Sequence, residues 1–163
     1  MITQLELKEL INYNPETGIF TWNKPRKAVA SKKQINNVNS LYGYMQVSLN
    51  YKKYFLHRLA WLYVYGYFPK NEIDHINNNR SDNRIENLRE ATRSENSRNT
   101  RLNVRNTSGF KGISWFSRLK KWRAYININK KQITLGYYSD IEIAKKVINE
   151  ARLKHHGIFA NAG

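Results

Sequence analysis

A short polar and basic segment, residues 100–108, divides this chain of 163 residues into two parts. Leu102 and Val104 are its only large apolar side chains. A segment with so little apolar surface adds almost nothing to a hydrophobic core, and this composition is typical of a linker. We therefore expect two small domains, residues 1–99 and 109–163, each with a core of modest size.

Composition limits the kind of protein that these domains form. Lysine and arginine number 28 against 12 acidic residues, which gives a net charge of +16, yet 40% of the residues are hydrophobic and 13% aromatic. That apolar content predicts folded domains rather than a disordered basic tail. No apolar run approaches the roughly 18 residues that cross a bilayer, and the N-terminus does not resemble a signal peptide. We expect a folded intracellular protein that binds a polyanion and not a membrane.

The acidic residues are concentrated in the middle of the sequence. Residues 57–99 carry seven basic and six acidic side chains, whereas residues 100–163 carry thirteen basic and three acidic. Carboxylates repel phosphate, so a nucleic-acid clamp gains nothing from them, but a divalent-cation site needs them. Ordinary surface ion pairs are the competing explanation. The sequence contains no cysteine, which excludes disulfides, cysteine-ligated structural zinc and a thiol nucleophile.

Local patterns predict the elements of the first domain. Thr3 and Glu6 form a capping box, which indicates a helix with Leu7, Leu10 and Ile11 on one face. Further along we predict a strand over 19–22, a loop over 24–39, a hairpin of 44–49 and 54–56 with a turn at 50–53, and a buried helix over 57–65 ending at Gly66.

A ββα pattern occupies residues 72–99. We predict short strands over 72–75 and 85–89, with Asn87 on the second, and a helix through 99 that opens on a second capping box, Thr92 to Glu95. The segments resemble those of the HNH homing endonucleases of bacteriophages, and the lead-in at 13–22 is also similar. The resemblance rests on His57-Arg58-Leu59-Ala60, Ile73-Asp74-His75-Ile76-Asn77, Arg84-Ile85-Glu86-Asn87-Leu88-Arg89 and Ser94-Glu95-Asn96.

The resemblance implies a role for four residues. The residue matching His75 is the general base, those matching Asp74 and Asn96 hold the metal, and the one matching Asn87 braces the loop. This chemistry is reasonable, because a neutral histidine takes a proton near pH 7 and oxygen ligands suit one magnesium or manganese ion. We expect no other small-molecule cofactor. A purely structural histidine and ordinary asparagine turns are the competing interpretations, and we interpret His57 as structural.

The C-terminal domain follows a different pattern. Three strands rich in aromatic and β-branched residues are predicted over 110–115, 122–128 and 132–138. A third capping box, Ser139 to Glu142, opens a helix that stops at Gly157 and sets Ala144, Val147, Ile148 and Ala151 on one face.

This domain resembles the Apetala-two-type DNA-binding domains of plant ethylene-response factors, which also occur fused to phage HNH nucleases. The resemblance rests on Gly109-Phe110-Lys111-Gly112-Ile113, Trp122-Arg123-Ala124, Leu135-Gly136-Tyr137 and Gly157-Ile158-Phe159-Ala160-Asn161. It implies a sheet that enters the major groove. A solvated basic face is the competing interpretation of the lysines. The predicted DNA-binding residues are Lys111, Gly112, Ser114, Phe116, Arg118, Lys120, Lys121, Arg123, Tyr125, Asn127, Gln132 and Thr134.

Together these patterns predict an α+β protein with an HNH ββα nuclease module and a C-terminal three-stranded antiparallel sheet packed on one helix. The predicted function is a metal-dependent, homing-type DNA endonuclease that acts on duplex DNA as a monomer, in the host cytoplasm if a phage encodes it. Two other functions remain open: a DNA-binding regulator with an inert nuclease module, and an RNA-binding module.

Overall fold

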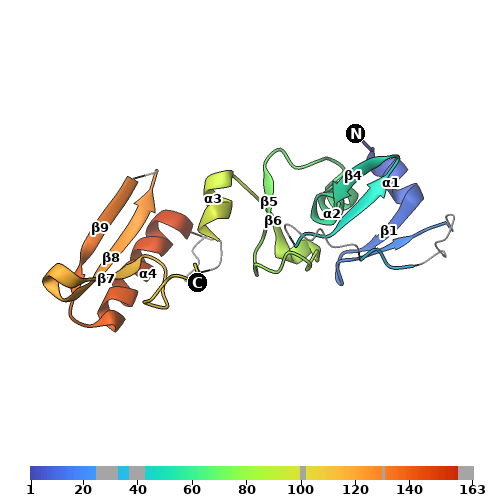
Figure 1. Cartoon of the computed structure of the whole chain (residues 1–163). Helices are drawn as coiled ribbons and strands as arrows, with labels where there is room; N and C mark the ends of the chain where they lie inside the picture. The colour runs from blue at the N-terminus through green and yellow to red at the C-terminus, as the bar shows by residue number, and fades with distance from the viewer. Residues whose placement is uncertain (25–32, 37–42, 100–101, 130, 158–163) are drawn as a thin grey trace. The chain divides into compact units, whose positions relative to one another are not determined.

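A computed structural model describes residues 1–24, 33–36, 43–99, 102–129 and 131–157 (Figure 1). The chain divides into two compact units, residues 1–93 and 94–163. Lys130, most of the predicted loop at 24–39, part of the predicted linker and the Phe159-Ala160-Asn161 motif lie outside the described residues. Within the described residues, no helix combines the length and the apolar character that a membrane span needs.

The first unit begins with helix α1 (Gln4–Leu10), which is capped as predicted by Thr3 and Glu6. Ile11 does not extend this helix, because it begins strand β1 (Ile11–Asn14), which pairs with β2 (Ile19–Trp22). The part of the predicted loop that is described, 33–36, also departs from the expectation. Ile35 donates its backbone N–H to the carbonyl of Phe20 and is buried in the core, so this segment lies along β2.

Strands β3 (Gln46–Leu49) and β4 (Lys52–Phe55) form the predicted hairpin, with a shorter turn. Asn50 and Tyr51 alone make the turn, both with positive φ, and Lys52 pairs with Leu49. A two-residue turn of this kind matches the twist of the two strands. Helix α2 (Leu56–Tyr65) follows directly and ends at Gly66 in the left-handed conformation, as predicted.

The ββα region contains β5 (Glu72–His75), the 3-10 helix η1 (Ile85–Asn87) and β6 (Leu88–Ala91). The prediction of one strand over 85–89 with Asn87 on it is therefore wrong. The backbone N–H of Asn87 bonds the carbonyl of Arg84, which closes a helical turn, and the ladder with β5 begins only at Leu88, opposite His75. Asn87 thus lies at the end of a turn rather than on the strand.

Helix α3 (Arg93–Arg98) follows β6 at the boundary between the two units. From Ser94 onward it groups with the second unit, whereas the sequence assigns it to the nuclease module. The two units are defined by how densely their residues pack and not by function. The domain limits 1–99, 100–108 and 109–163 therefore stay predictions.

The second unit contains a three-stranded antiparallel sheet in the order β7-β8-β9. The strands are β7 (Ile113–Phe116), β8 (Lys121–Ile128) and β9 (Lys131–Tyr138), with a 3-10 turn η2 (Ser117–Leu119) between the first two. Strand β7 begins three residues later than predicted because Gly112 has a φ of +71°. Any side chain there would also meet the Tyr125 carbonyl at 2.5 Å, so this position requires glycine.

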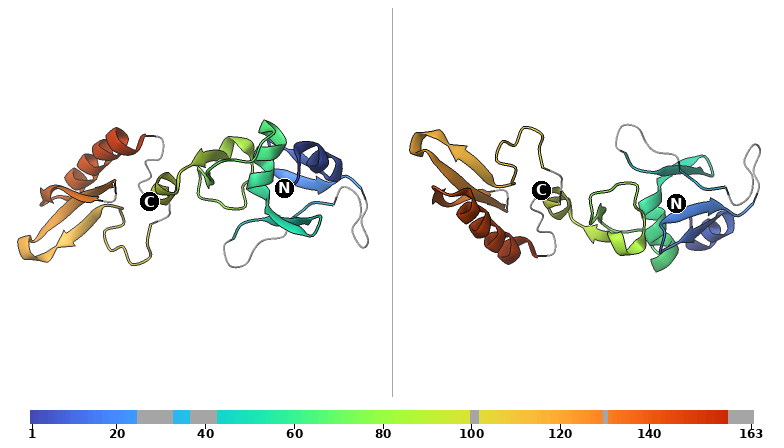
Figure 2. Two further views of the ribbon diagram at one scale, coloured as in Figure 1. Left: turned by 90° about the horizontal axis from the view of Figure 1, so that it is seen from above. Right: turned by 90° about the horizontal axis from the view of Figure 1, so that it is seen from below.

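Helix α4 (Ile141–His156) lies alongside the sheet in both views of Figure 2. Its N-cap is Asp140, one residue after the predicted Ser139, because the Asp140 carboxylate accepts the N–H of Glu142. Ala144 and Ile148 are buried, in agreement with the predicted apolar face. They pack against Ile113, Ala124 and Ile126, which makes a separate small core for this unit.

Candidate active site

Asp74 and Arg89 are cross-strand partners in the β5–β6 hairpin. The Asp74 Oδ2 atom accepts from Arg89 Nε at 2.8 Å and lies 2.7 Å from a terminal guanidinium nitrogen of Arg89. Asp74 is only 4% exposed, so solvent screens the attraction between the two charges less than in a surface ion pair. The hairpin therefore fixes a carboxylate in the site.

His75 is the last residue of β5 and is also 4% exposed. Its Nε2 atom lies 3.4 Å from Oδ1 of Asn83, a long contact that is a hydrogen bond only in the tautomer with a proton on Nε2. Burial lowers the pKa of His75 below its usual value, although Asn83 and two nearby aspartates act in the opposite direction. The imidazole is therefore mainly neutral at pH 7, the state that a general base needs.

His57 lies beside His75, with the ring centroids 5.2 Å apart in an edge-on arrangement. Burial, followed by the charges of His75 and Arg58, lowers the pKa of His57 to about 3. Its Nδ1 atom has no hydrogen-bond partner among the residues that the structure describes. Tyr44 packs against both imidazoles. His57 is thus a buried neutral ring that supports His75, as its predicted structural role requires.

Asn87 ties the two ends of the loop between β5 and β6 together. Its Oδ1 atom accepts the backbone N–H of Asn77 at 3.0 Å, and its Nδ2 atom donates to the Asp82 carbonyl at 2.9 Å. Asn87 is buried, so these bonds are protected from water. This geometry suits the bracing role that the resemblance implies, and it occupies the amide atoms that a metal ligand would use.

Two further loop residues, Asp82 and Asn83, escaped the sequence reasoning. Asp82 binds Arg84 through both carboxylate oxygens, at 2.9 and 2.8 Å, and this guanidinium lowers the pKa of Asp82 to about 2. Asn83 is 1% exposed and contacts His75. The sequence feature that could have indicated them is an asparagine-rich stretch, and such stretches usually form ordinary turns. Only burial distinguishes Asn83 from its neighbours.

The lead-in over 13–22 supports this loop from outside. The Tyr13 hydroxyl donates to the Asn83 carbonyl at 2.8 Å, and Ile85 donates its N–H to the Pro15 carbonyl. Gly18 has a φ of +70°, and a side chain there would lie 2.5 Å from the Arg84 backbone nitrogen. The lead-in and the loop between β5 and β6 are therefore in direct backbone contact.

The predicted metal ligands fall in two different units of the chain. Asp74, His75 and Asn87 lie together in the first unit, whereas Asn96 lies on α3 in the second. No group of three histidine or acidic side chains that could hold a metal occurs in the described ranges. The predicted donor set is different in kind, with one carboxylate and one carboxamide. Both are oxygen ligands of the type that magnesium and manganese accept.

The predicted DNA-binding residues of the second unit largely share one face of the sheet. Side chains alternate along a strand, and the register places the opposite face against α4. Eight of the twelve predicted residues lie on the outer face: Ser114, Phe116, Lys121, Arg123, Tyr125, Asn127, Gln132 and Thr134. Lys111 and Gly112 precede β7, Arg118 lies in η2, and Lys120 follows it in the left-handed conformation.

Aromatic and cationic groups meet on this outer face. The Arg123 guanidinium lies 4.8 Å from the Tyr125 ring centroid, and Phe116 contacts Tyr137 at 5.1 Å. Tyr137 was not predicted. It reaches the outer face because β9 contains a bulge at Leu135, which shifts the alternation by one residue. The bulge turns Leu135 toward the helix.

Comparisons with known proteins provide independent evidence on this chain. The HNH endonuclease family model matches residues 54–98. Protein 3.8 of Escherichia phage T7 is 34% identical over 105 residues, which are 64% of this chain and 86% of the phage protein. The chain belongs to the family of this phage protein and contains an HNH endonuclease domain. The chain is also similar to a solved structure described as DNA binding and cleavage by the HNH homing endonuclease I-HmuI. The match covers 90% of this chain and 85% of the other, with 20% identity and a TM-score of 0.40.

The family segment of this HNH protein runs from β4 into α3 and includes Asp74, His75, Asn87 and Asn96. It ends before the three-stranded sheet. The Apetala-two resemblance of the second unit therefore stays a prediction.

Proposed function

We propose that this HNH protein is a metal-dependent endonuclease that hydrolyses phosphodiester bonds in duplex DNA. The observation that carries the proposal is the adjacent pair Asp74 and His75 at the end of β5, with the imidazole buried and neutral. A relative encoded by a phage favours the homing type of enzyme and a role inside the infected cell.

His75 is the general base of this mechanism. The contact between Nε2 and Asn83 Oδ1 orients the ring, and the neutral imidazole takes a proton from water. The water oxygen then bonds to phosphorus, and the bond from phosphorus to the 3′ oxygen breaks. Asn87 and Asn83 keep the loop and the ring in place during this step, because both are buried and bonded within the loop.

Asp74 and Asn96 are the proposed ligands of the metal. When bound, magnesium or manganese would neutralise charge on the phosphate and stabilise the departing oxygen. Arg89 holds Asp74 in a fixed orientation through Oδ2. A carboxamide as the second ligand leaves more positive charge on the ion than a second carboxylate would.

The second unit supplies DNA binding in this proposal. Its outer sheet face presents cationic, aromatic and amide side chains, and residues 100–163 carry a net charge of +10. Phosphate contacts from such a surface provide affinity, whereas amides such as Asn127 and Gln132 contact base edges. A regulator with an inert nuclease module would use the same face, so cleavage itself must separate the two functions.

Incubation of the full chain with genomic DNA of its source and magnesium, followed by sequencing of the new ends, tests the proposal. Breaks at a small set of positions support a homing endonuclease, provided that His75→Ala produces none. Binding without any breaks in either protein identifies the regulator instead.

A further inference from the structure

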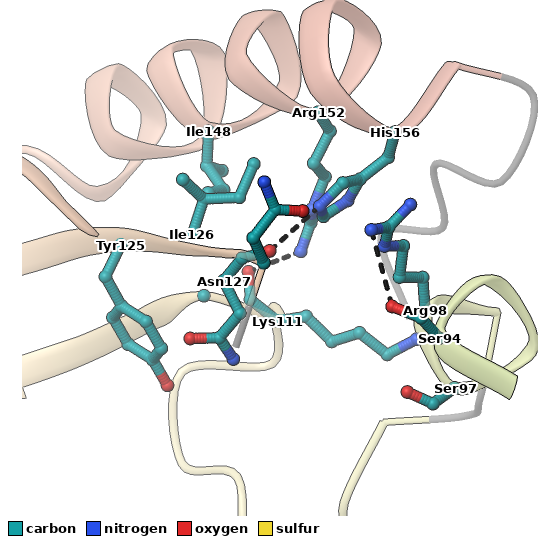
Figure 3. Close-up of a pocket in the computed structure, with 12 residues that line it drawn as sticks. Ser94, Ser97, Arg98, Lys111, Tyr125, Ile126, Asn127, Ile148, Arg152 and His156 are labelled. Carbon is teal, nitrogen blue, oxygen red and sulfur yellow. Dashed lines mark hydrogen bonds between the residues drawn. The ribbon is translucent and has the colours of Figure 1, made fainter. Parts of the chain in front are cut away.

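The second unit contains a cavity of about 310 Å³ between α3, α4 and the sheet (Figure 3). Four basic side chains line it, from three different elements: Arg98 on α3, Lys111 before β7, and Arg152 and His156 on α4. Ser94 and Ser97 add hydroxyl groups from α3. No carboxylate lines the cavity within the described residues. A cavity with this lining attracts an anion.

Arg152 provides the strongest indication of a ligand. It is only 6% exposed, and its guanidinium donates to two neutral acceptors, the Lys111 carbonyl at 2.6 Å and Asn149 Oδ1 at 3.4 Å. Its third contact is the Phe110 ring. Within the described part of the chain, no carboxylate pairs with it. A buried cation without a counter-charge is costly, and a bound anion removes that cost.

The neighbouring basic groups feel the same positive potential. Burial and then the charge of Arg152 lower the pKa of Lys111. Burial lowers the pKa of His156, and Arg98 and Arg152 act in the same direction, although the Asn127 carbonyl opposes them. In Figure 3, Arg152 and His156 point from α4 toward the strand while Lys111 extends toward α3. Cations from separate elements thus converge on one space.

We propose that this cavity binds a phosphate ester of the nucleic-acid backbone. The cavity volume lies at the lower end of the range for ligand pockets. A cavity of this size suits one phosphate with its adjoining sugar. Guanidinium and hydroxyl groups are the usual donors to phosphate oxygens. The inference rests on the proposed function for the source of the phosphate, and it adds a contact that lies away from the outer sheet face.

The site has a consequence for the nuclease. Ser94, Ser97 and Arg98 lie on the same short helix as Asn96, the proposed metal ligand. A backbone phosphate held by this helix and by α4 therefore connects DNA bound by the second unit to a residue of the proposed catalytic centre.

Salt-dependent binding of the full chain to a short labelled duplex tests the source of the phosphate. Arg98→Gln and Lys111→Gln should each reduce the log–log salt slope by about 0.9, the value for one lost phosphate contact. Lys154→Gln is the matched control, because it removes the same charge from an exposed position on α4 outside the cavity. Equal slopes in all three variants would overturn the assignment to the backbone.

Inorganic phosphate tests the cavity itself without DNA. At constant ionic strength, phosphate in place of chloride should raise the unfolding midpoint of the wild type and of Lys154→Gln. The increase should disappear in Arg152→Met, and in Arg98→Gln should Arg152→Met not fold. No increase in the wild type refutes the anion site. An increase together with unchanged DNA slopes means a free phosphate ester is the ligand. If both the salt slopes and the phosphate effect are as expected but the protein does not cleave DNA, the proposed nuclease activity is refuted and the anion site is not.

Discussion

Arg89 binds Asp74 with two guanidinium nitrogens on a single carboxylate oxygen, Oδ2, across the β5–β6 hairpin. The arrangement compensates a buried charge from one side of the carboxylate. It also makes the stability of the site depend on a residue that carries out no chemistry.

We expect Arg89→Met to destabilise the protein by about 3–5 kcal/mol, because it removes the guanidinium that compensates the charge of the buried Asp74 carboxylate. Urea unfolding measures the loss. Arg84→Met is the control, since the Arg84 side chain is 40% exposed and its ion pair contributes at most about 1 kcal/mol. Excess magnesium should restore more stability to Arg89→Met than to the wild type, and an equal response would argue against Asp74 as a ligand.

His75→Ala should slow cleavage by about 10²–10⁴-fold, the usual contribution of a general base, and leave duplex affinity unchanged. Single-turnover cleavage and gel shifts on the same duplex separate the two effects. Asn83→Ala should produce a smaller loss, because it removes the contact that orients the ring and two bonds within its surroundings but leaves the imidazole in place. Wild-type cleavage by His75→Ala would remove the proposed base.

Magnesium or manganese should support cleavage, and EDTA should abolish it. Asp74→Ala should then require more metal for half-maximal cleavage or lose activity at every metal concentration, and Asn96→Ala should show a milder form of the same defect. Metal titration of cleavage distinguishes them. Undiminished cutting in EDTA would contradict the metal assignment.

Stability should fall as the pH drops from about 6.5 toward 3. The pKa of His57 is about 3 in the folded protein and near 6.5 when unfolded, so between these values the unfolded chain binds the extra proton. One such proton gives a slope of at most about 1.4 kcal/mol per pH unit. His75 acts in the same direction. Urea unfolding across this pH range should show a shallower slope for His57→Phe than for the wild type.

Substitutions on the outer sheet face should separate affinity from specificity. Lys121→Ala should weaken binding to all duplexes alike, since a phosphate contact carries no sequence information. Asn127→Ala and Gln132→Ala should instead reduce the preference at particular base pairs, by about 1–3 kcal/mol each. Binding to a library of duplexes distinguishes the patterns. A uniform loss for the two amides would mean that they contact the backbone.

The sequence predicted helix ends correctly where the capping residue lies next to the helix in the chain. Gly66 ends α2 and Thr3 caps α1, as the sequence indicated, because both depend only on near neighbours. The boundary between η1 and β6 escaped prediction, since it depends on the partner strand. The pattern of apolar residues over 85–89 is compatible with both a strand and a tight turn.

The active site shows the same division. The family resemblance assigns roles to Asp74, His75 and Asn87, which the structure brings together in the first unit, and it assigns none to Asn83 or Arg89. Asn83 is one of several asparagines in the loop, and its burial and its bonds with Tyr13 and Met45, which lie far away in the sequence, are evident only in the structure. The face that each β9 side chain occupies also required the structure, because Gly136 is compatible with a bulge but does not fix its position at Leu135.

The contact between Gly18 and the backbone of Asn83 and Arg84 bears on protein engineering. The segment that defines the HNH family here starts at residue 54, well after this turn. A nuclease core transplanted from that segment alone would lose the backbone that packs against the loop between β5 and β6. It would also lose the Tyr13 hydrogen bond. A functional graft should therefore start before Tyr13 and keep glycine at position 18.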